Sequence, residues 1–256
     1  MSHPWTCVVS YHTDPEHCGV AKFNRQLARR LGVPMVKLGE HYWEGERPLF
    51  SMKWAELPVA LRSLCWHKRD VLWHDTPTLA APVTGRHWYL PAIGVPALVQ
   101  PSTLVQPALF TFGMSHKIQV PLFRALQAQL PPCQLWVSTA THEGAGPSRI
   151  PDLMAAWGAT ARNLGTLSDE ALGLVWPHVS ALVAFFDAGL RANNTTVHAA
   201  LDAGVPVITN HGDETPDDLR ALTHDYRGLT KFPPQPEGPS PYTWARLLEA
   251  LCDPSR

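Results

Sequence analysis

The chain has 256 residues, of which 45% are hydrophobic and 17% are charged, with a formal net charge of −1. This size and composition allow one large or two small domains with a buried core, and they exclude a disordered chain. The near-neutral charge, without any run of lysines or arginines, argues against a protein that mainly holds nucleic-acid backbones, although a local basic cleft would not show in the total.

The cysteines indicate a reducing compartment. There are five of them and no Cys-x-x-Cys pair, which disfavours a disulfide framework and a structural zinc site. The first residues lack a basic start followed by an apolar run, and no apolar stretch reaches membrane-spanning length. We therefore expect a cytoplasmic protein without a signal peptide or a transmembrane segment.

The first half opens as a strand–helix–strand unit. We expect a strand over residues 5–11 and, after a turn-rich loop that ends at Gly19, a helix over 20–31 whose apolar residues share one face. Gly32 stops this helix, and residues 34–38 read as a second strand.

The remainder of the first half is less regular. Residues 40–53 are aromatic and irregular, and we expect no regular element there. A helix over about 54–65 leads to a strand over 70–74. Prolines and glycines interrupt everything from 77 to 107, so we place the domain junction in that region.

The second half alternates strands and helices, which indicates a parallel sheet. The expected strands cover 108–113, 134–138, a short segment ending at Gly165, 181–186 and 205–209; the expected helices cover 118–130, 150–157, 168–172 and 194–203. These patterns predict an N-terminal domain over 1–105 and a C-terminal domain over 106–235. The proline-rich residues 236–256 would end in a helix over 242–252 that packs back across the junction.

The most informative stretch runs from Leu182 to Asn210 and reads as strand, polar loop, helix and strand. Its loop places polar side chains just before the helix: Arg191, Asn193, Asn194, Thr195 and Thr196. Unpaired amides and the helix dipole favour an anion at such a helix start, at the edge of an α/β sheet where ligands bind. A phosphate-bearing ligand is the first expectation, and a plain N-cap is the alternative. His198 and Asp202 lie one turn apart, and we expect a solvated pair.

With these motifs in order, the chain resembles compact GT-B glycosyltransferases of the retaining, nucleotide-sugar-dependent kind. Asn163-Leu-Gly-Thr-Leu-Ser-Asp-Glu-Ala-Leu172 and Ala199-Ala-Leu-Asp-Ala-Gly-Val-Pro-Val-Ile208 are similar to two donor-domain segments of that family. Phe112–Lys117 resembles the segment that opens its second domain. In the first half, Cys18–Ala28 resembles its glycine loop and Leu90–Val95 its hinge. The resemblance implies an α/β fold with two Rossmann-like parallel-sheet domains facing a cleft, the first domain being reduced.

The resemblance also implies site residues. Lys117 and Arg191 would hold the donor diphosphate, and His74 and Asp75 would lie by the transferred sugar or the reaction centre, with a surface role for Lys117 and a turn role for Asp75 as alternatives. The expected substrate-binding residues are Gly19, Gly113, His116, Glu143, Gly165, Thr166, Leu167, Asn193, Asn194, Thr195 and Thr196. Glu143 would serve as a ribose contact. The family implies no permanently bound cofactor and no metal, and the spacing of His12, Asp14, Glu16 and His17 fits no standard zinc pattern.

One departure from the family concerns its two glutamates, eight positions apart, that touch the donor sugar and ribose. Arg191 and Ala199 occupy those positions here. We expect a hexosyltransferase that moves a sugar from a UDP- or GDP-sugar to a hydroxyl acceptor, whether a glycan, a small molecule or a modified DNA base. The alternatives are a phage-type DNA glycosyltransferase acting on a hydroxymethylated pyrimidine, which would need an extruded base, and a catalytically silent nucleotide- or glycan-binding protein.

Overall fold

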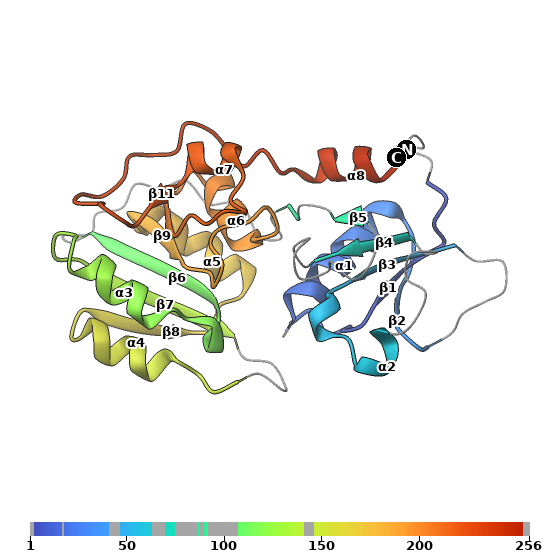
Figure 1. Ribbon diagram of the computed structural model, residues 1–256, viewed down its shortest axis with the longest axis horizontal. Coiled ribbons are helices and arrows are strands. Elements are labelled where there is room, and N and C mark those ends of the chain that lie inside the picture. Colours follow the sequence, from blue (N-terminus) through green and yellow to red (C-terminus); the bar gives the residue numbers. More distant parts are fainter. Residues whose placement is uncertain are drawn as a thin grey trace. The chain divides into compact units, whose positions relative to one another are not determined.

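The computed structural model describes residues 3–16, 18–40, 47–62, 70–74, 86–87, 90–91, 107–140 and 146–252. The chain divides into two units (Figure 1). The first comprises Met1–Ile93 with Thr243–Arg256, and the second comprises Gly94–Tyr242. Each unit has its own parallel sheet. The expected junction over 77–107 lies mostly outside the described residues.

The first unit contains a five-stranded sheet in the order β2-β1-β3-β4-β5, and every adjacent pair is parallel. Its strands are β1 (Cys7–Ser10), β2 (Met35–Lys37), β3 (Pro48–Met52), β4 (Asp70–Trp73) and β5 (Arg86–His87). Its helical elements are α1 (Gly19–Leu31), the 3-10 turn η1 (Trp54–Glu56), α2 (Val59–Arg62) and α8 (Trp244–Cys252).

The expected α1 is confirmed, and its apolar spacing explains its position. Val20, Phe23 and Leu27 lie on one face of the helix and are buried. The helix ends at Gly32, whose φ of 70° is in the left-handed region, as is common at helix C-termini.

The expectation of an irregular segment over 40–53 was wrong for residues 48–52, which form β3 at the middle of the sheet. All its residues after Pro48 are buried, so the strand shows no alternation of apolar and polar residues. The expected helix over 54–65 was also wrong in its described part. It is divided into η1 and α2 because Pro58 lies between them and has no N–H to continue a helix.

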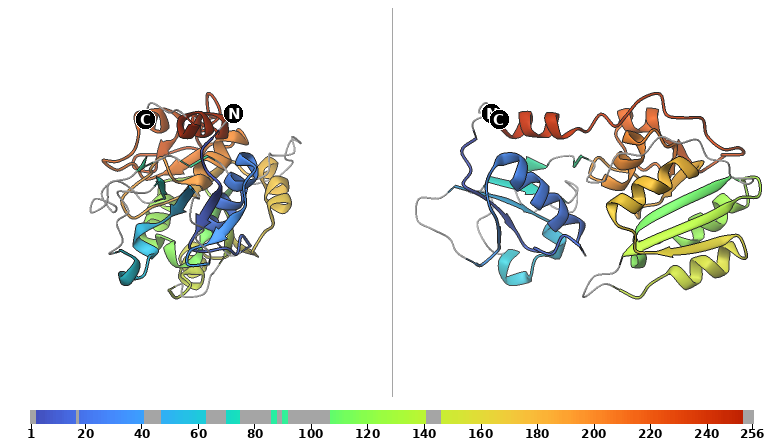
Figure 2. Two further views of the ribbon diagram at one scale, coloured as in Figure 1. Left: turned by 90° about the vertical axis from the view of Figure 1, so that its right-hand side faces the viewer. Right: turned by 180° about the vertical axis from the view of Figure 1, so that it is seen from behind.

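Helix α8 belongs to the first unit, although it comes last in the chain (red in Figure 2). Its Leu247 and Leu251 are buried in the same cluster as Phe23 and Leu27 of α1. Trp244 stacks on Phe23 with ring centroids 4.9 Å apart. The first unit therefore completes its core with residues from the end of the described chain.

The second unit contains a six-stranded parallel sheet in the order β11-β10-β9-β6-β7-β8. Its strands are β6 (Ala108–Met114), β7 (Gln134–Ala140), β8 (Ala161–Gly165), β9 (Ala181–Ala184), β10 (Val207–Thr209) and β11 (His224–Asp225). Its helical elements are η3 (Ser115–Lys117), α3 (Val120–Gln127), α4 (Ile150–Trp157), α5 (Asp169–Val175), η4 (Trp176–His178), α6 (Thr195–Asp202) and α7 (Asp217–Leu222). The alternation predicted for this half is confirmed; α7 and β11 were not predicted.

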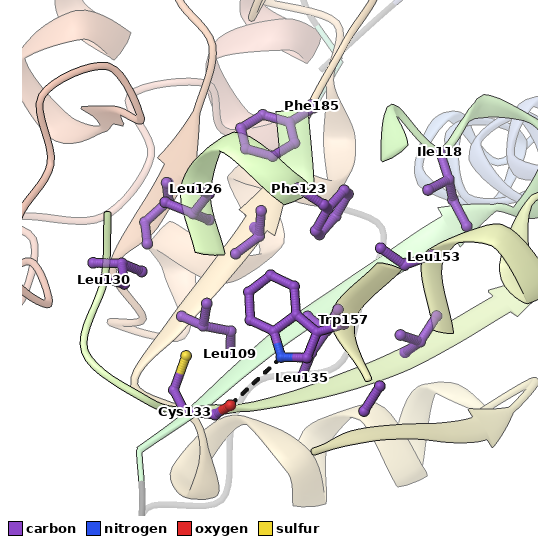
Figure 3. Packing of buried hydrophobic residues seen from close by; sticks show 14 of the residues in the cluster. Leu109, Ile118, Phe123, Leu126, Leu130, Cys133, Leu135, Leu153, Trp157 and Phe185 are labelled. Carbon is purple, nitrogen blue, oxygen red and sulfur yellow. Dashed lines mark hydrogen bonds between the residues drawn. The ribbon is translucent and has the colours of Figure 1, made fainter. Parts of the chain in front are cut away.

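The main core of the second unit lies between the sheet and helices α3 and α4 (Figure 3). Phe123 and Leu126 of α3 and Trp157 of α4 pack onto Leu135 of β7. The indole Nε1 of Trp157 donates a hydrogen bond to the Cys133 carbonyl oxygen at 3.5 Å, so the ring has a polar partner inside the core.

The predicted fold class is confirmed: the protein is α/β, with two Rossmann-like parallel sheets, the smaller one in the first unit. In the described part of the chain, no helix combines the length and the apolarity that crossing a membrane requires.

Candidate functional site

The candidate site lies at the carboxyl edge of the second sheet. Strands β10, β9 and β6 are neighbours, so the loops that follow them lie at the same edge, where ligands bind in α/β folds. Two of these loops are tied together by Gln119, whose side-chain amide donates to the carbonyl oxygen of Lys117 at 3.3 Å and to the carboxylate of Asp187. The loops that carry Lys117 and Arg191 are therefore adjacent.

The loop after β9 is fastened to the loop after β10 by hydrogen bonds. The Asn210 side chain accepts the Phe186 N–H at 2.9 Å and donates to the Phe186 carbonyl oxygen at 2.7 Å. The Asn210 carbonyl oxygen also accepts the Leu190 N–H at 2.8 Å. One asparagine thus holds both ends of the segment that leads to Arg191.

Two glycines let the same loops approach backbone to backbone. A Cβ at Gly189 would lie 2.4 Å from the Gly212 nitrogen, and a Cβ at Gly212 would lie 2.2 Å from the Ala188 carbonyl oxygen. Gly189 also has a φ of 86°. Because no side chain fits there, this junction is a tight and specific part of the site.

Arg191 lies on this fastened loop, with its side chain only 18% exposed. Its Nη1 is 3.7 Å from Oε2 of Glu214, which follows β10. Its Nε is buried and has no hydrogen-bond acceptor among the described residues. A guanidinium with an unused donor at the edge of a parallel sheet is suited to bind an anion.

The start of α6 differs from a simple N-cap. Asn194 stands at the N-cap position, but its side chain makes no capping hydrogen bond; its Oδ1 instead accepts the Arg191 N–H at 2.7 Å. The N–H of Asn194 in turn donates to the Arg191 carbonyl oxygen at 3.1 Å. Asn193, Thr195 and Thr196 adjoin this closed turn and are all partly exposed. The structure thus brings these predicted residues together around the start of α6.

The expected solvated pair of His198 and Asp202 was wrong. His198 is fully buried, and burial lowers its pKa to about 4. Both side chains instead hold Ser240: its Oγ lies 2.9 Å from Nδ1 of His198, and its N–H donates to Oδ1 of Asp202 at 3.1 Å. The segment before α8 covers His198, which is therefore shielded from solvent, whereas Asp202 stays exposed and accepts the Ser240 N–H.

The predicted Gly113 lies near the end of β6, and the predicted His116 and Lys117 lie in η3, which follows that strand. Gly113 has a φ of 143°, Lys117 is exposed and His116 is partly buried. Arg149 was not predicted; it is an exposed cation whose N–H donates to the Ser115 carbonyl oxygen at 3.1 Å. Its position between β7 and α4, a strand-to-loop-to-helix connection, was the signal that could have identified it.

Gly165, Thr166 and Leu167 lie at the end of β8. Gly165 has a φ of 71°, and the Thr166 hydroxyl donates to the Thr139 carbonyl oxygen at 2.9 Å, which holds the turn against the end of β7. Leu167 is partly buried. Glu143, the expected ribose contact, lies outside the described residues.

In the first unit, His74 ends a chain of buried polar contacts. Its Nε2 lies 2.8 Å from the Ser51 hydroxyl, and Asn24 donates from its Nδ2 to the Ser51 carbonyl oxygen and to the Ser10 hydroxyl, both at 2.7 Å. Burial, with a smaller contribution from Lys53, lowers the pKa of His74 to about 3, so the imidazole is neutral. Gly19 begins α1, and Asp75 lies outside the described residues.

The arrangement in the second unit is able to bind an anion. Arg191, Lys117 and Arg149 come from loops at one sheet edge, beside the start of α6. In the described ranges, no three side chains of histidine, cysteine, aspartate or glutamate gather as a metal site would require.

No family model and no curated protein matches the sequence. Among solved structures, the chain is similar to AviGT4, a glycosyltransferase involved in avilamycin A biosynthesis, with a TM-score of 0.51 and 14% identity, covering 82% of this chain and 80% of that one.

Two further matches are weaker. WaaG, a glycosyltransferase involved in lipopolysaccharide biosynthesis, has a TM-score of 0.47 and 9% identity, covering 82% of this chain and 81% of that one. HepE of Anabaena, solved with UDP, has a TM-score of 0.48 and 13% identity, and the match covers 98% of this chain and 90% of that one. The likeness to AviGT4, together with the two parallel sheets, shows that this protein has the GT-B fold of glycosyltransferases.

Proposed function

We propose that this protein is a glycosyltransferase that moves a sugar from a nucleotide diphosphate donor, a UDP- or GDP-sugar, to a hydroxyl acceptor. The observation that carries the proposal is Arg191, a largely buried cation with an unused Nε donor at the carboxyl edge of the second sheet. The fold shared with the glycosyltransferase AviGT4 supports it. Because one fold can host many chemistries, this site and not the fold carries the proposal.

In the proposed reaction, the bond between the sugar and the diphosphate breaks and negative charge grows on the departing phosphate. Arg191 and Lys117 stabilise that charge, and the turn formed by Asn193, Asn194, Thr195 and Thr196 contributes amides and hydroxyls. These two cations supply the positive charge that leaving-group departure needs, so the proposal requires neither a permanently bound cofactor nor a metal.

The remaining contacts extend the proposal over the other predicted residues. Gly165, Thr166 and Leu167 receive the nucleotide base, and Glu143 the ribose. Gly113 and His116 adjoin the phosphates, while Gly19, His74 and Asp75 are the proposed contacts of the first unit with the transferred sugar or the acceptor. The type of sugar, a hexose, and the retaining stereochemistry are parts of the same proposal.

Isothermal titration calorimetry with UDP, GDP, ADP and dTDP tests donor binding. We expect at least one to bind, and we expect R191A and K117A to weaken that binding about tenfold or more. R124A and K231A are matched controls, since both remove exposed cations of the same unit; Arg124 lies in the last turn of α3, which runs away from the carboxyl edge. If none of the four nucleotides binds, the proposal fails.

Transfer itself is tested by mass spectrometry of products after incubation with mixed nucleotide sugars and a cell lysate. Duplex DNA is added in two forms, with and without hydroxymethylated pyrimidines, so that the modified base is also tested as an acceptor. A mass increase of one hexose on any acceptor supports the proposal. Donor binding without transfer or donor hydrolysis would instead favour a silent binding protein, which the replacement of two family glutamates by Arg191 and Ala199 makes a specific second candidate.

A further inference from the structure

We propose that Glu214 is an exchangeable counter-ion of Arg191, which a ligand's diphosphate displaces from the guanidinium. In the ligand-free protein Glu214 then occupies the position of the ligand's anion. A ligand has to displace it in order to bind, so weakly charged ligands bind with low affinity. The inference rests on the proposed function for the nucleotide part of the ligand, whereas the exchange itself concerns only the diphosphate.

The pairing of these two residues is determined by the backbone. Leu190 precedes Arg191 and Thr215 follows Glu214, and the Thr215 hydroxyl donates to the Leu190 carbonyl oxygen at 2.6 Å. The same hydroxyl oxygen accepts the Gly212 N–H at 2.9 Å. A hydrogen bond between the immediate neighbours thus holds the backbones of Arg191 and Glu214 side by side.

The contact between the two charges is nevertheless incomplete. The Nη1–Oε2 distance of 3.7 Å is too long for a hydrogen bond, so the pair has Coulomb attraction without directional bonding. The buried Nε of Arg191 has no acceptor among the described residues. Glu214 therefore neutralises Arg191 without saturating its donors.

The difference in burial shows which partner can leave. The Arg191 side chain is 18% exposed, whereas that of Glu214 is 33% exposed. A largely buried guanidinium without any counter-charge is costly, so an anion has to be near it in either state. Glu214 can turn toward water when another anion arrives, while Arg191 remains on its fastened loop.

A diphosphate is the kind of anion that competes successfully for this position. It carries more than one negative charge and offers several oxygens, so it can accept two parallel hydrogen bonds from a guanidinium, including one from Nε. A ligand with a single weak charge gains less and still has to displace Glu214. The pair should therefore favour diphosphates over singly charged ligands.

The direction in which removal of Glu214 changes diphosphate affinity distinguishes a competing role of Glu214 from a positioning role. If Glu214 competes with the ligand, its removal tightens diphosphate binding. If it merely positions Arg191, its removal weakens binding. We expect Glu214→Gln to lower the dissociation constant of a diphosphate about threefold to tenfold, the range of a partly buried ion pair.

The experiment measures, by calorimetry on the full chain, the dissociation constants of inorganic pyrophosphate, UDP and GDP. The variants are E214Q, E214A, R191Q and the double variant R191Q/E214Q. The matched control is D213N, which makes the same charge change at the adjacent exposed residue; no ion pair found in the described ranges involves Asp213. Thermal unfolding of each variant verifies folding, and E214A replaces E214Q if the latter does not fold.

The expected result is tighter pyrophosphate binding by E214Q, a change below about twofold for D213N, and no gain when E214Q is added to R191Q. The exchange would be overturned if E214Q bound pyrophosphate more weakly than wild type or gained no more affinity than D213N. It would also be overturned if E214Q still raised the affinity in the R191Q background. A failure of pyrophosphate to bind to wild type and E214Q alike would overturn it as well. Pyrophosphate binding that follows the expected pattern without UDP or GDP binding would uphold the exchange and refute the proposed function.

Discussion

His198 holds the backbone carbonyl of Ala192, with its Nε2 2.7 Å from the carbonyl oxygen. The direction of this bond follows from its surroundings. The Ser240 Oγ accepts the Tyr242 N–H at 3.1 Å, so its own proton is available for Nδ1 of His198 at 2.9 Å. Nε2 therefore carries the imidazole proton and donates it to Ala192, the residue after Arg191. His198 on α6 thus holds the loop that carries Arg191 in place.

Replacement of His198 by alanine should loosen this loop and lower stability. The variant leaves the Ala192 carbonyl and the Ser240 hydroxyl without this partner and opens a cavity, so we expect the free energy of unfolding to fall by about 2–4 kcal/mol. Urea unfolding followed by circular dichroism measures the change, and UDP binding should weaken in parallel. H178A, which alters an exposed histidine of the same unit, should remain within about 0.5 kcal/mol of wild type.

Stability should depend on pH through the two buried histidines. Burial lowers the pKa of His74 to about 3 and that of His198 to about 4, whereas both have a pKa of 6.5 in the unfolded chain. Between pH 6.5 and 4 the unfolded chain binds protons that the folded protein does not. The free energy of unfolding therefore falls as the pH is lowered through this range, by up to about 1.4 kcal/mol per pH unit for each histidine.

Unfolding of wild type and H198Q at pH 7, 6 and 5 tests this dependence. The free energy of unfolding should change less steeply with pH in H198Q, because this variant lacks the proton uptake of one histidine. Burial raises the pKa of Asp202, which opposes part of the slope in both proteins. Equal slopes for wild type and H198Q would mean that His198 is not buried in its neutral form.

Gly189→Ala should damage the site more than its backbone conformation alone explains. A Cβ at Gly189 would lie 2.4 Å from the Gly212 nitrogen, so the loops after β9 and β10 would have to separate. We expect a loss of about 3 kcal/mol or more in unfolding free energy, together with weaker UDP binding.

The control for this variant is Gly228→Ala. Gly228 has a similar φ of 81°, but a Cβ there would meet no atom within 4 Å. The free energy of unfolding of this variant should therefore fall only by the cost of the left-handed conformation, about 1–2 kcal/mol, and its affinity for UDP should not change. If the two variants behave alike in urea unfolding, close approach of the two loops is not what requires glycine at 189.

Leu247→Ala should destabilise the first unit although the substitution is close to the end of the chain. Leu247 is fully buried with Phe23 and Leu27, so the variant should lose about 2–5 kcal/mol. Hydrogen exchange by mass spectrometry should show faster exchange in β1 and α1 and unchanged exchange in β6. Leu248→Ala, at a partly buried neighbour, should have a smaller effect.

Much of the second unit could be predicted from the sequence because its elements follow local rules. Strands such as β9 are short apolar runs between turn signals, and α6 ends where Gly204 adopts a φ of 70°. Strand β3 escaped prediction because it is central and buried along its length, so it lacks alternation and resembles an irregular apolar segment.

The contacts within the candidate site depended on residues distant in sequence. The helix start and Arg191 were visible as a polar loop after a strand, but Glu214 reaches Arg191 from the loop of another strand. The burial of His198 depends on Ser240, which lies 42 positions away in sequence. Sequence patterns report the neighbours within one element, and these partners are brought together only by the sheet order and by the covering segment.

The position of α8 in the first unit has a consequence for the order of folding during synthesis. Leu247 and Leu251 emerge from the ribosome after the whole second unit, yet they belong to the core that contains Phe23. Domains usually fold in the order in which they are translated. Here the first unit cannot complete its core until α8 has been translated. The second unit can therefore close its core first, while the nascent first unit stays open to chaperones and proteases until α8 is made.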